Sequence, residues 1–223
     1  MSGLKEKVFR SPTLLRVVPF VIFLILTSLQ GQFGEGSRYW LYAAKTILGA
    51  AMIWAVGPRI TEMRWKISWE GVLVGIAMFA VWVGLDNFYP HFEKSVAVWN
   101  PHQHFGQGSA VAWIFICVRL LGSTLVVPPL EEVFYRSFLY RYLIRSDFEK
   151  VPLGEFRWSA FIISSLIFGV VHPQQWLAGI LCGLAFQALV CRHKRLGDAM
   201  TAHATTNLFL GLWVFWKDAW QFW

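Results

Sequence analysis

The sequence predicts an all-α, polytopic membrane helix bundle of seven to eight helices. Of its 223 residues, 56% are hydrophobic and 15% are charged, whereas soluble domains average roughly 45–50% apolar and about 25% charged. Continuous apolar runs recur at the length of about 20 residues that a membrane-spanning helix needs. The 13 tryptophans and 19 phenylalanines supply aromatic side chains for two membrane interfaces. A soluble protein with a very large core is the alternative, and the repeated long runs disfavour it.

Seven apolar segments and one more amphipathic segment mark the expected helices. Helices satisfy their own backbone hydrogen bonds in lipid, and the unbroken runs lack the alternation of barrel strands. Because the loops are short and no repeat occurs, we expect one membrane domain over 1–223, with N-terminal membrane helices in 1–109 and candidate catalytic helices in 110–216. The apolar segments fall at about 14–30, 39–57, 71–89, 110–127, 158–171, 176–191 and 198–216, and the amphipathic helix at about 130–145.

The first apolar run follows Lys5, Lys7 and Arg10 and superficially resembles a signal peptide. No small-residue cleavage site follows Leu29, so we interpret the run as a retained first helix. The three cysteines lie in apolar runs at no metal-binding spacing, which indicates small buried hydrophobic residues rather than disulfides or a zinc site.

The basic residues predict orientation rather than nucleic-acid binding. The net charge of +7 resides mainly in short loops between apolar segments, as in membrane proteins. The basic residues form one set early in the chain and one set late in it. If all eight helices cross the membrane, the two sets lie on opposite membrane faces. If one helix near Pro128 and Pro129 enters the membrane without crossing it, both sets lie on the same face. The positive-inside rule favours the second alternative, with a cytoplasmic N-terminus. The early set includes Arg16, Arg59, Arg64 and Lys66, and the late set Arg141, Arg145, Lys150, Arg157, Arg192, Lys194 and Arg195.

Two adjacent carboxylates, Glu131 and Glu132, lie within the apolar part of the chain, five and four residues before Arg136.

 Burying a charge in hydrocarbon costs about 2.5 to 3.5 kcal/mol even on the mildest insertion scale. Such residues are therefore candidates for chemistry inside the bilayer, together with the histidines and the asparagine of later apolar segments.

The two glutamates are expected to differ in role. Glu132 and Arg136 are four residues apart with the acid first, the favoured order for a helical ion pair, so Arg136 would hold Glu132 ionised. Glu131 points about 100° away from Glu132 around the helix, so it is the freer carboxylate and the better candidate base. We expect Pro128 and Pro129 to begin this helix, whose exposed N–H dipoles would favour a negative charge there. The alternative is that both acids only tie helices together.

Three further polar residues lie in the later helices. Glu131 lies 14 residues before Arg145, and His172 lies 14 residues after Trp158, so at about 1.5 Å per residue an antiparallel hairpin would bring them to one depth, roughly 21 Å from the loop. His203 and Asn207 are four residues apart and share a helical face. Helix capping and interhelical hydrogen bonding are the alternatives for these residues.

Glu131-Glu132 with Arg136, Phe168 with His172, and His203 with Asn207 fit three ordered motifs, EExxxR, FxxxH and HxxxN. The sequence thereby resembles the CAAX protease and bacteriocin-processing family of intramembrane endopeptidases, related to the type II CAAX prenyl endopeptidase. The motifs cover about residues 125–210, while the first 110 residues match only as generic membrane helices. Ser137 stands where many members carry glycine, a departure expected to affect helix packing more than chemistry.

The resemblance implies a glutamate-type peptidase in which Glu131 and His172 activate water. It implies that His203 and Asn207 donate hydrogen bonds to the oxyanion, with Glu132 and Arg136 in support. Other intramembrane protease plans are disfavoured because HExxH, GxGD and Gly-x-Ser-x-Gly are absent.

No cofactor is expected, although Glu131, His172 and His203 are acceptable zinc ligands and leave a metal-dependent version open. The expected partners are the lipid bilayer and a membrane-anchored or lipidated protein substrate, with no nucleic acid, and the expected location is the cell membrane, as a multi-pass protein. The rival function is a non-enzymatic membrane scaffold or immunity-type binding protein that uses the same polar pocket. The sequence does not indicate an oligomeric state.

Overall fold

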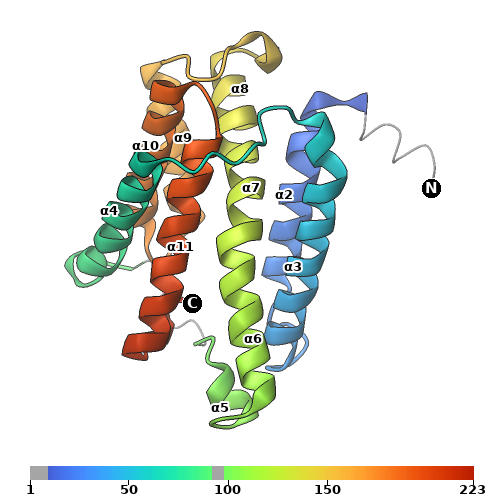
Figure 1. Ribbon diagram of the computed structural model, residues 1–223, viewed down its shortest axis with the longest axis vertical. Coiled ribbons are helices and arrows are strands. Elements are labelled where there is room, and N and C mark those ends of the chain that lie inside the picture. The colour runs from blue at the N-terminus through green and yellow to red at the C-terminus, as the bar shows by residue number, and fades with distance from the viewer. Residues whose placement is uncertain (1–9, 92–97) are drawn as a thin grey trace.

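The computed structural model describes residues 10–91 and 98–223, and its regular elements within these ranges are all helices (Figure 1). This confirms the predicted helical membrane bundle. Lys5 and Lys7 of the early basic set lie outside the described residues. The main helices are α2 (Pro12–Ser28), α3 (Ser37–Val56), α4 (Trp69–Leu85), α5 (Pro101–Phe105), α6 (Ala110–Leu121), α7 (Val127–Glu132), α8 (Tyr140–Ile144), α9 (Trp158–Val170), α10 (Trp176–His193) and α11 (Gly197–Lys217).

Local sequence signals set the ends of several helices. Ser11 precedes α2, and its Oγ accepts a hydrogen bond from the Leu14 backbone N–H at 3.3 Å, with Pro12 at the first helical position. Ser68 caps α4 in the same way, accepting from the Gly71 N–H at 3.1 Å. A capping hydroxyl satisfies an N–H that the first turn leaves without an intrahelical partner.

Four helical stretches are long and apolar enough to cross a membrane: Ser37–Arg59, Trp69–Phe88, Ala110–Ile144 and Trp176–His193. Pro12–Ser28 and Trp158–Val170 are shorter apolar helices. Large apolar side chains are exposed on these helices, among them Trp54 at 83% and Phe88 at 80%. In lipid such surfaces face acyl chains or the interface rather than water, which fits a membrane protein.

The expected separation into helices at 110–127 and 130–145 is wrong. Residues 110–144 form one continuous helical stretch, in which α6, α7 and α8 stand end to end (Figure 1). Two π-helical segments, Gly122–Val126 and Val133–Leu139, join its three parts. Pro128 and Pro129 therefore lie inside a long helix and do not begin one, so no exposed helix N-terminus faces Glu131.

Both basic sets lie at the same end of the bundle. Glu62, in the loop after α3, pairs with Arg16 of α2 at 2.6 Å and with Arg141 of α8 at 3.3 Å. Glu70, at the start of α4, pairs with Arg192 at the end of α10 at 2.9 Å. The sets share one end because 110–144 is a single helix, which removes one crossing. That this end is cytoplasmic stays a prediction of the positive-inside rule.

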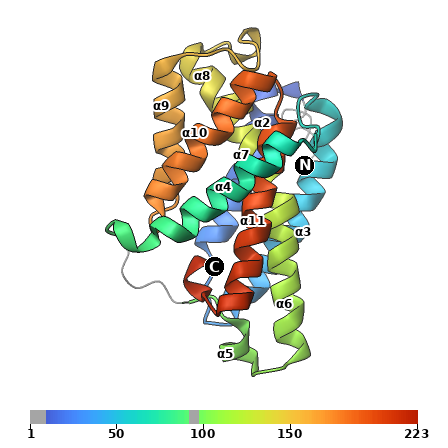
Figure 2. The ribbon, with the colours of Figure 1, turned by 60° about the vertical axis from the view of Figure 1, so that its left-hand side comes forward.

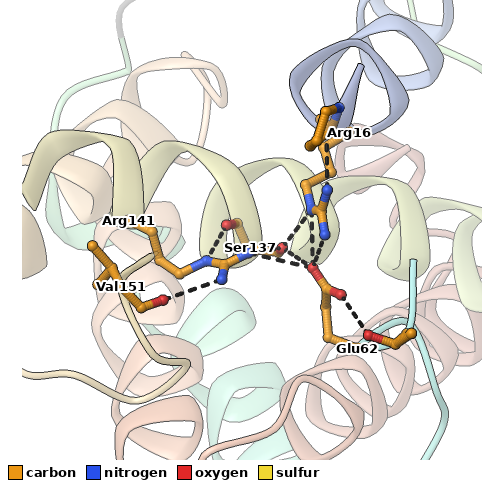
Figure 3. A network of polar contacts seen from close by, with 7 residues as sticks. Arg16, Glu62, Ser137, Arg141 and Val151 are labelled. Carbon is orange, nitrogen blue, oxygen red and sulfur yellow. Dashed lines mark hydrogen bonds and ion pairs between the residues drawn. The ribbon is translucent and has the colours of Figure 1, made fainter. Parts of the chain in front are cut away.

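Ser137 belongs to this polar network at the end of the bundle (Figure 3). Its Oγ accepts hydrogen bonds from Arg16 Nε at 2.9 Å and from Arg141 Nη2 at 2.8 Å, and it donates to Glu62. The hydroxyl thus joins α2, the loop after α3 and the long helix. Ser137 does not line the cavity described below, which fits the expected role in packing.

Small residues let the helices that surround the candidate site approach closely. α4 crosses α10 and α11 at an angle (Figure 2), and a Cβ added at Gly75 would lie 2.5 Å from the Ala202 carbonyl oxygen of α11. A Cβ added at Gly183 of α10 would lie 2.8 Å from Ser165 Cα of α9. Close backbone contact through small residues is the usual means by which membrane helices pack.

Candidate active site

The backbone around the two glutamates departs from regular α-helix on both sides. Proline lacks an N–H, so a helix that contains proline leaves carbonyls without their usual donor. In the π-helical pattern of Gly122–Val126 the donor to the Ser123 carbonyl would be residue 128, which is proline. The side-chain amide of Asn207 in α11 donates to this carbonyl instead, at 2.8 Å. π-Helical turns are rare and often mark functional sites.

Glu132 is fully buried and paired through both of its oxygens. Its Oε2 lies 3.2 Å from Arg136 Nε in the predicted i,i+4 ion pair, and both side chains are 0% exposed. Its Oε1 accepts a hydrogen bond from His203 Nδ1 at 2.9 Å. The Arg136 guanidinium carbon lies 4.8 Å from the centroid of the Phe168 ring. Burying such a pair is costly, and it is maintained only when each charge has partners.

Glu131 has a different environment from its neighbour. Its Oε2 is buried and has no hydrogen-bond partner among the described residues, and it lies 4.0 Å from His203 Nε2. Its side chain is 12% exposed. A separation of 4.0 Å is too long for a direct hydrogen bond, and a small molecule between the two atoms can bridge such a gap. The freer carboxylate expected at Glu131 is thus present.

His172 and Asn207 each use one polar atom to hold the side chain in place. His172 Nδ1 lies 2.7 Å from the Phe168 carbonyl oxygen. Because a carbonyl oxygen only accepts hydrogen bonds, Nδ1 carries the proton, and Nε2 of the neutral ring is free to accept one. Asn207 uses one amide N–H for Ser123 and retains a second. Trp82 of α4 packs edge-on against the His172 ring, with centroids 5.6 Å apart.

One cavity of about 290 Å³ brings all four candidate catalytic residues together, Glu131, His172, His203 and Asn207. It lies among α2, α3, α4, the long helix and α9–α11, the helices that contribute its lining residues. Its walls include Phe20, Phe23, Phe168 and Phe186, and the Phe186 ring stacks on His203 with centroids 5.3 Å apart. Glu132 and Arg136 stand behind the cavity, not in its lining.

Sequence reasoning missed three features of this site. It did not foresee the Glu132–His203 hydrogen bond, because the two residues are 71 positions apart and no local pattern links them. It also missed Lys45 of α3 and Arg119 of α6, which line the same cavity. The rule that singled out Glu131, an ionisable residue inside an apolar segment, applies equally to both.

No group of three or more histidine, cysteine, aspartate or glutamate side chains in the described ranges is arranged to hold a metal ion. Glu131 and His203 do approach each other, and His172 lines the same cavity.

Together, the helical fold and the cavity define a polytopic membrane protein with a buried carboxylate–imidazole site. Residues 112–209 match the Rce1-like family model, whose description is type II CAAX prenyl endopeptidase Rce1-like. This match confirms the resemblance drawn from the three motifs. No curated protein and no solved structure matches the chain. The family match supports a CAAX-type intramembrane protease in general terms.

Proposed function

We propose that this protein is a glutamate-type intramembrane endopeptidase of the cell membrane that cuts a membrane-anchored or lipidated protein near its end. The observation that carries the proposal is the cavity that Glu131 shares with two imidazoles and a carboxamide, with one Glu131 oxygen lacking a hydrogen-bond partner among the described residues. The family match of residues 112–209 supports the peptidase class.

In the proposed reaction, Glu131 and His172 position one water molecule. The water donates one hydrogen bond to the Glu131 carboxylate and the other to His172 Nε2. Its oxygen attacks the peptide carbonyl carbon while one proton passes to Glu131, which later transfers it to the leaving amide nitrogen as the C–N bond breaks. The products are a carboxylic acid and an amine, and the acid passes its remaining proton to the amine to give a carboxylate and an ammonium group. General acid–base catalysis of this kind contributes typically 10²–10⁴-fold to the rate.

His203 and Asn207 would stabilise the oxyanion that forms during the attack. With Glu132 accepting from Nδ1, the proposal requires His203 to donate from Nε2 as an imidazolium, the form in which both ring nitrogens carry a proton. The second amide N–H of Asn207 supplies the other donor. Losing one such donor typically costs about 10²–10³ in kcat.

The proposal is tested by comparing the C-termini of membrane proteins in cells that carry the native chain, Glu131→Gln or His172→Ala. We expect at least one new C-terminus with the native chain and none with either variant at equal membrane abundance. Glu149→Gln, an exposed acid outside the cavity, is the matched control and should retain cleavage. If both variants keep full cellular function while stably inserted, the protein is a scaffold or binding protein instead.

The metal-dependent version is tested separately, by chelation. A chelator-treated, metal-free preparation that still cleaves the substrate would exclude it, whereas activity that returns only with added zinc would establish it.

A further inference from the structure

The catalytic cavity contains two cations that the proposed reaction does not use. Lys45 of α3 is 5% exposed, and Arg119 of α6 is partly buried. Both line the cavity and lie in segments long and apolar enough to cross the membrane. A cation inside a membrane protein is costly unless it is paired, so an ionisable residue there is a candidate for function.

Neither cation has a carboxylate partner within ion-pair distance among residues 10–91 and 98–223. Lys45 Nζ donates to Thr27 Oγ1 at 2.9 Å and lies 4.6 Å from the Phe23 ring centroid. An ammonium group has three N–H donors, and the threonine uses one. Glu131 lines the same cavity, and its Oε2 lies 4.0 Å from His203 Nε2.

Within the described residues, the guanidinium of Arg119 packs against three aromatic rings. Its guanidinium carbon lies 4.5 Å from the Trp99 ring centroid, 5.4 Å from that of Trp223 and 4.9 Å from that of Tyr42. Lys45 Nζ lies 4.5 Å from the same Tyr42 ring. The two cations therefore flank one tyrosine. Cation–π contacts stabilise the charges but leave guanidinium N–H donors available for an anion.

We propose that Lys45 and Arg119 form a subsite for the C-terminal carboxylate of the peptide substrate. This inference rests on the proposed peptidase function. Arginine and lysine form charge-assisted hydrogen bonds with carboxylates, which are about twice as strong as neutral ones. The negative charge of Glu131 repels a carboxylate, so the substrate is oriented with its C-terminus toward the cations and its scissile carbonyl toward Glu131.

The test measures binding without cleavage, in full-length protein that carries Glu131→Gln in lipid nanodiscs. The probe is a dansylated tetrapeptide of leucine and valine with a free C-terminal carboxylate, compared with the same peptide as a carboxamide. Energy transfer to dansyl from tryptophan reports binding, because Trp82 and Trp223 line the cavity. We expect the carboxylate to bind about 10-fold more tightly, because hydrogen bonds between charged groups are stronger than those to a neutral amide.

Lys45→Met and Arg119→Met should each reduce this preference toward unity, because the affinity for the carboxylate falls more than the affinity for the carboxamide. Lys45→Arg keeps the charge and should retain a preference. The matched control is Lys217→Met: Lys217 lies 4.0 Å from the Trp216 ring centroid and does not line the cavity, so its loss should leave the preference intact.

Equal binding of the two peptides would overturn the subsite, as would inorganic phosphate or phosphatidic acid displacing the probe while acetate does not. The latter result would assign the cations to a phosphate group. Because Glu131 carries no carboxyl in these measurements, their failure contradicts the subsite alone. Failure of the native chain to cleave any membrane protein contradicts the proposed function.

Discussion

At the scale of single residues, Glu131 and Glu132 are neighbours in sequence with opposite surroundings. Glu132 contacts Arg136 and His203 and is 0% exposed, whereas one oxygen of Glu131 has no hydrogen-bond partner in the described structure. The helical offset of about 100° between adjacent residues separates a carboxylate tied to other helices from one directed into the cavity. The proposed chemistry uses this difference.

The two acids should respond differently to neutralisation. Glu132→Gln leaves the Arg136 charge buried without its counter-ion, and breaking a buried pair typically costs about 3–5 kcal/mol. Glu131→Gln removes no ion pair within 3.5 Å and should lower stability much less. Denaturant or thermal unfolding in one detergent compares them. A larger loss of stability for Glu131→Gln than for Glu132→Gln would contradict the assignment.

At the scale of helices, the apolar runs predicted the positions of the helices well and the connections between them poorly. The run expected at 158–171 corresponds to Trp158–Val170, and that at 176–191 to Trp176–His193. Pro128 and Pro129 were expected at a helix start because proline is favoured there. The structure instead accommodates them in a long helix with π-helical turns, and Asn207 bonds the Ser123 carbonyl.

The sequence predicted which residues belong to the candidate site, but it did not predict the contacts between them. Polar residues inside apolar runs and their ordered motifs pointed to Glu131, His172, His203 and Asn207. The Glu132–His203 bond depends on how α7 packs against α11, which no local spacing encodes. Lys45 lies outside the motif region, and only the folded bundle brings it to the cavity.

Close packing of α4 on α11 supplies a test at this scale. A Cβ added at Gly75 would lie 2.5 Å from both the Ala202 carbonyl oxygen and Thr205 Cβ, whereas one at Gly84 of the same helix meets nothing within 4 Å. Gly75→Ala should therefore destabilise the protein by about 1–3 kcal/mol through overpacking. Gly84→Ala should be neutral or slightly stabilising, because alanine favours helix. Equal unfolding midpoints for both variants would contradict this packing.

At the scale of the whole molecule, the Glu62 network ties α2, the loop after α3 and the long helix at one end (Figure 3). Burial by itself raises the pKa of Glu62, but the hydrogen bond from Ser137 and the charge of Arg16 outweigh it, so the pKa lies below its ordinary value. The stabilisation is therefore complete above the unfolded-state pKa of about 4.3 and is lost as pH falls through the lower folded-state pKa.

Glu62→Gln should unfold at a lower temperature than the native chain at pH 7, because it leaves two arginines without their shared anion. The difference should shrink as pH falls from about 4.3 toward the lower folded-state pKa, below which Glu62 is neutral in the native chain as well. Thermal unfolding between pH 7 and pH 3 measures this difference, with Glu149→Gln as control. A difference that is independent of pH would contradict a contribution from the Glu62 charge.

The central claim is that Glu131 activates water rather than attacking the substrate itself. The direct measurement is a single turnover in ¹⁸O-labelled water, followed by mass spectrometry of the product and of the peptide that contains Glu131. The substrate is the one identified by its new C-terminus. We predict one ¹⁸O atom in the new product carboxylate and none in Glu131. Label incorporated into Glu131 during that turnover would show a covalent acyl intermediate and contradict the proposed mechanism.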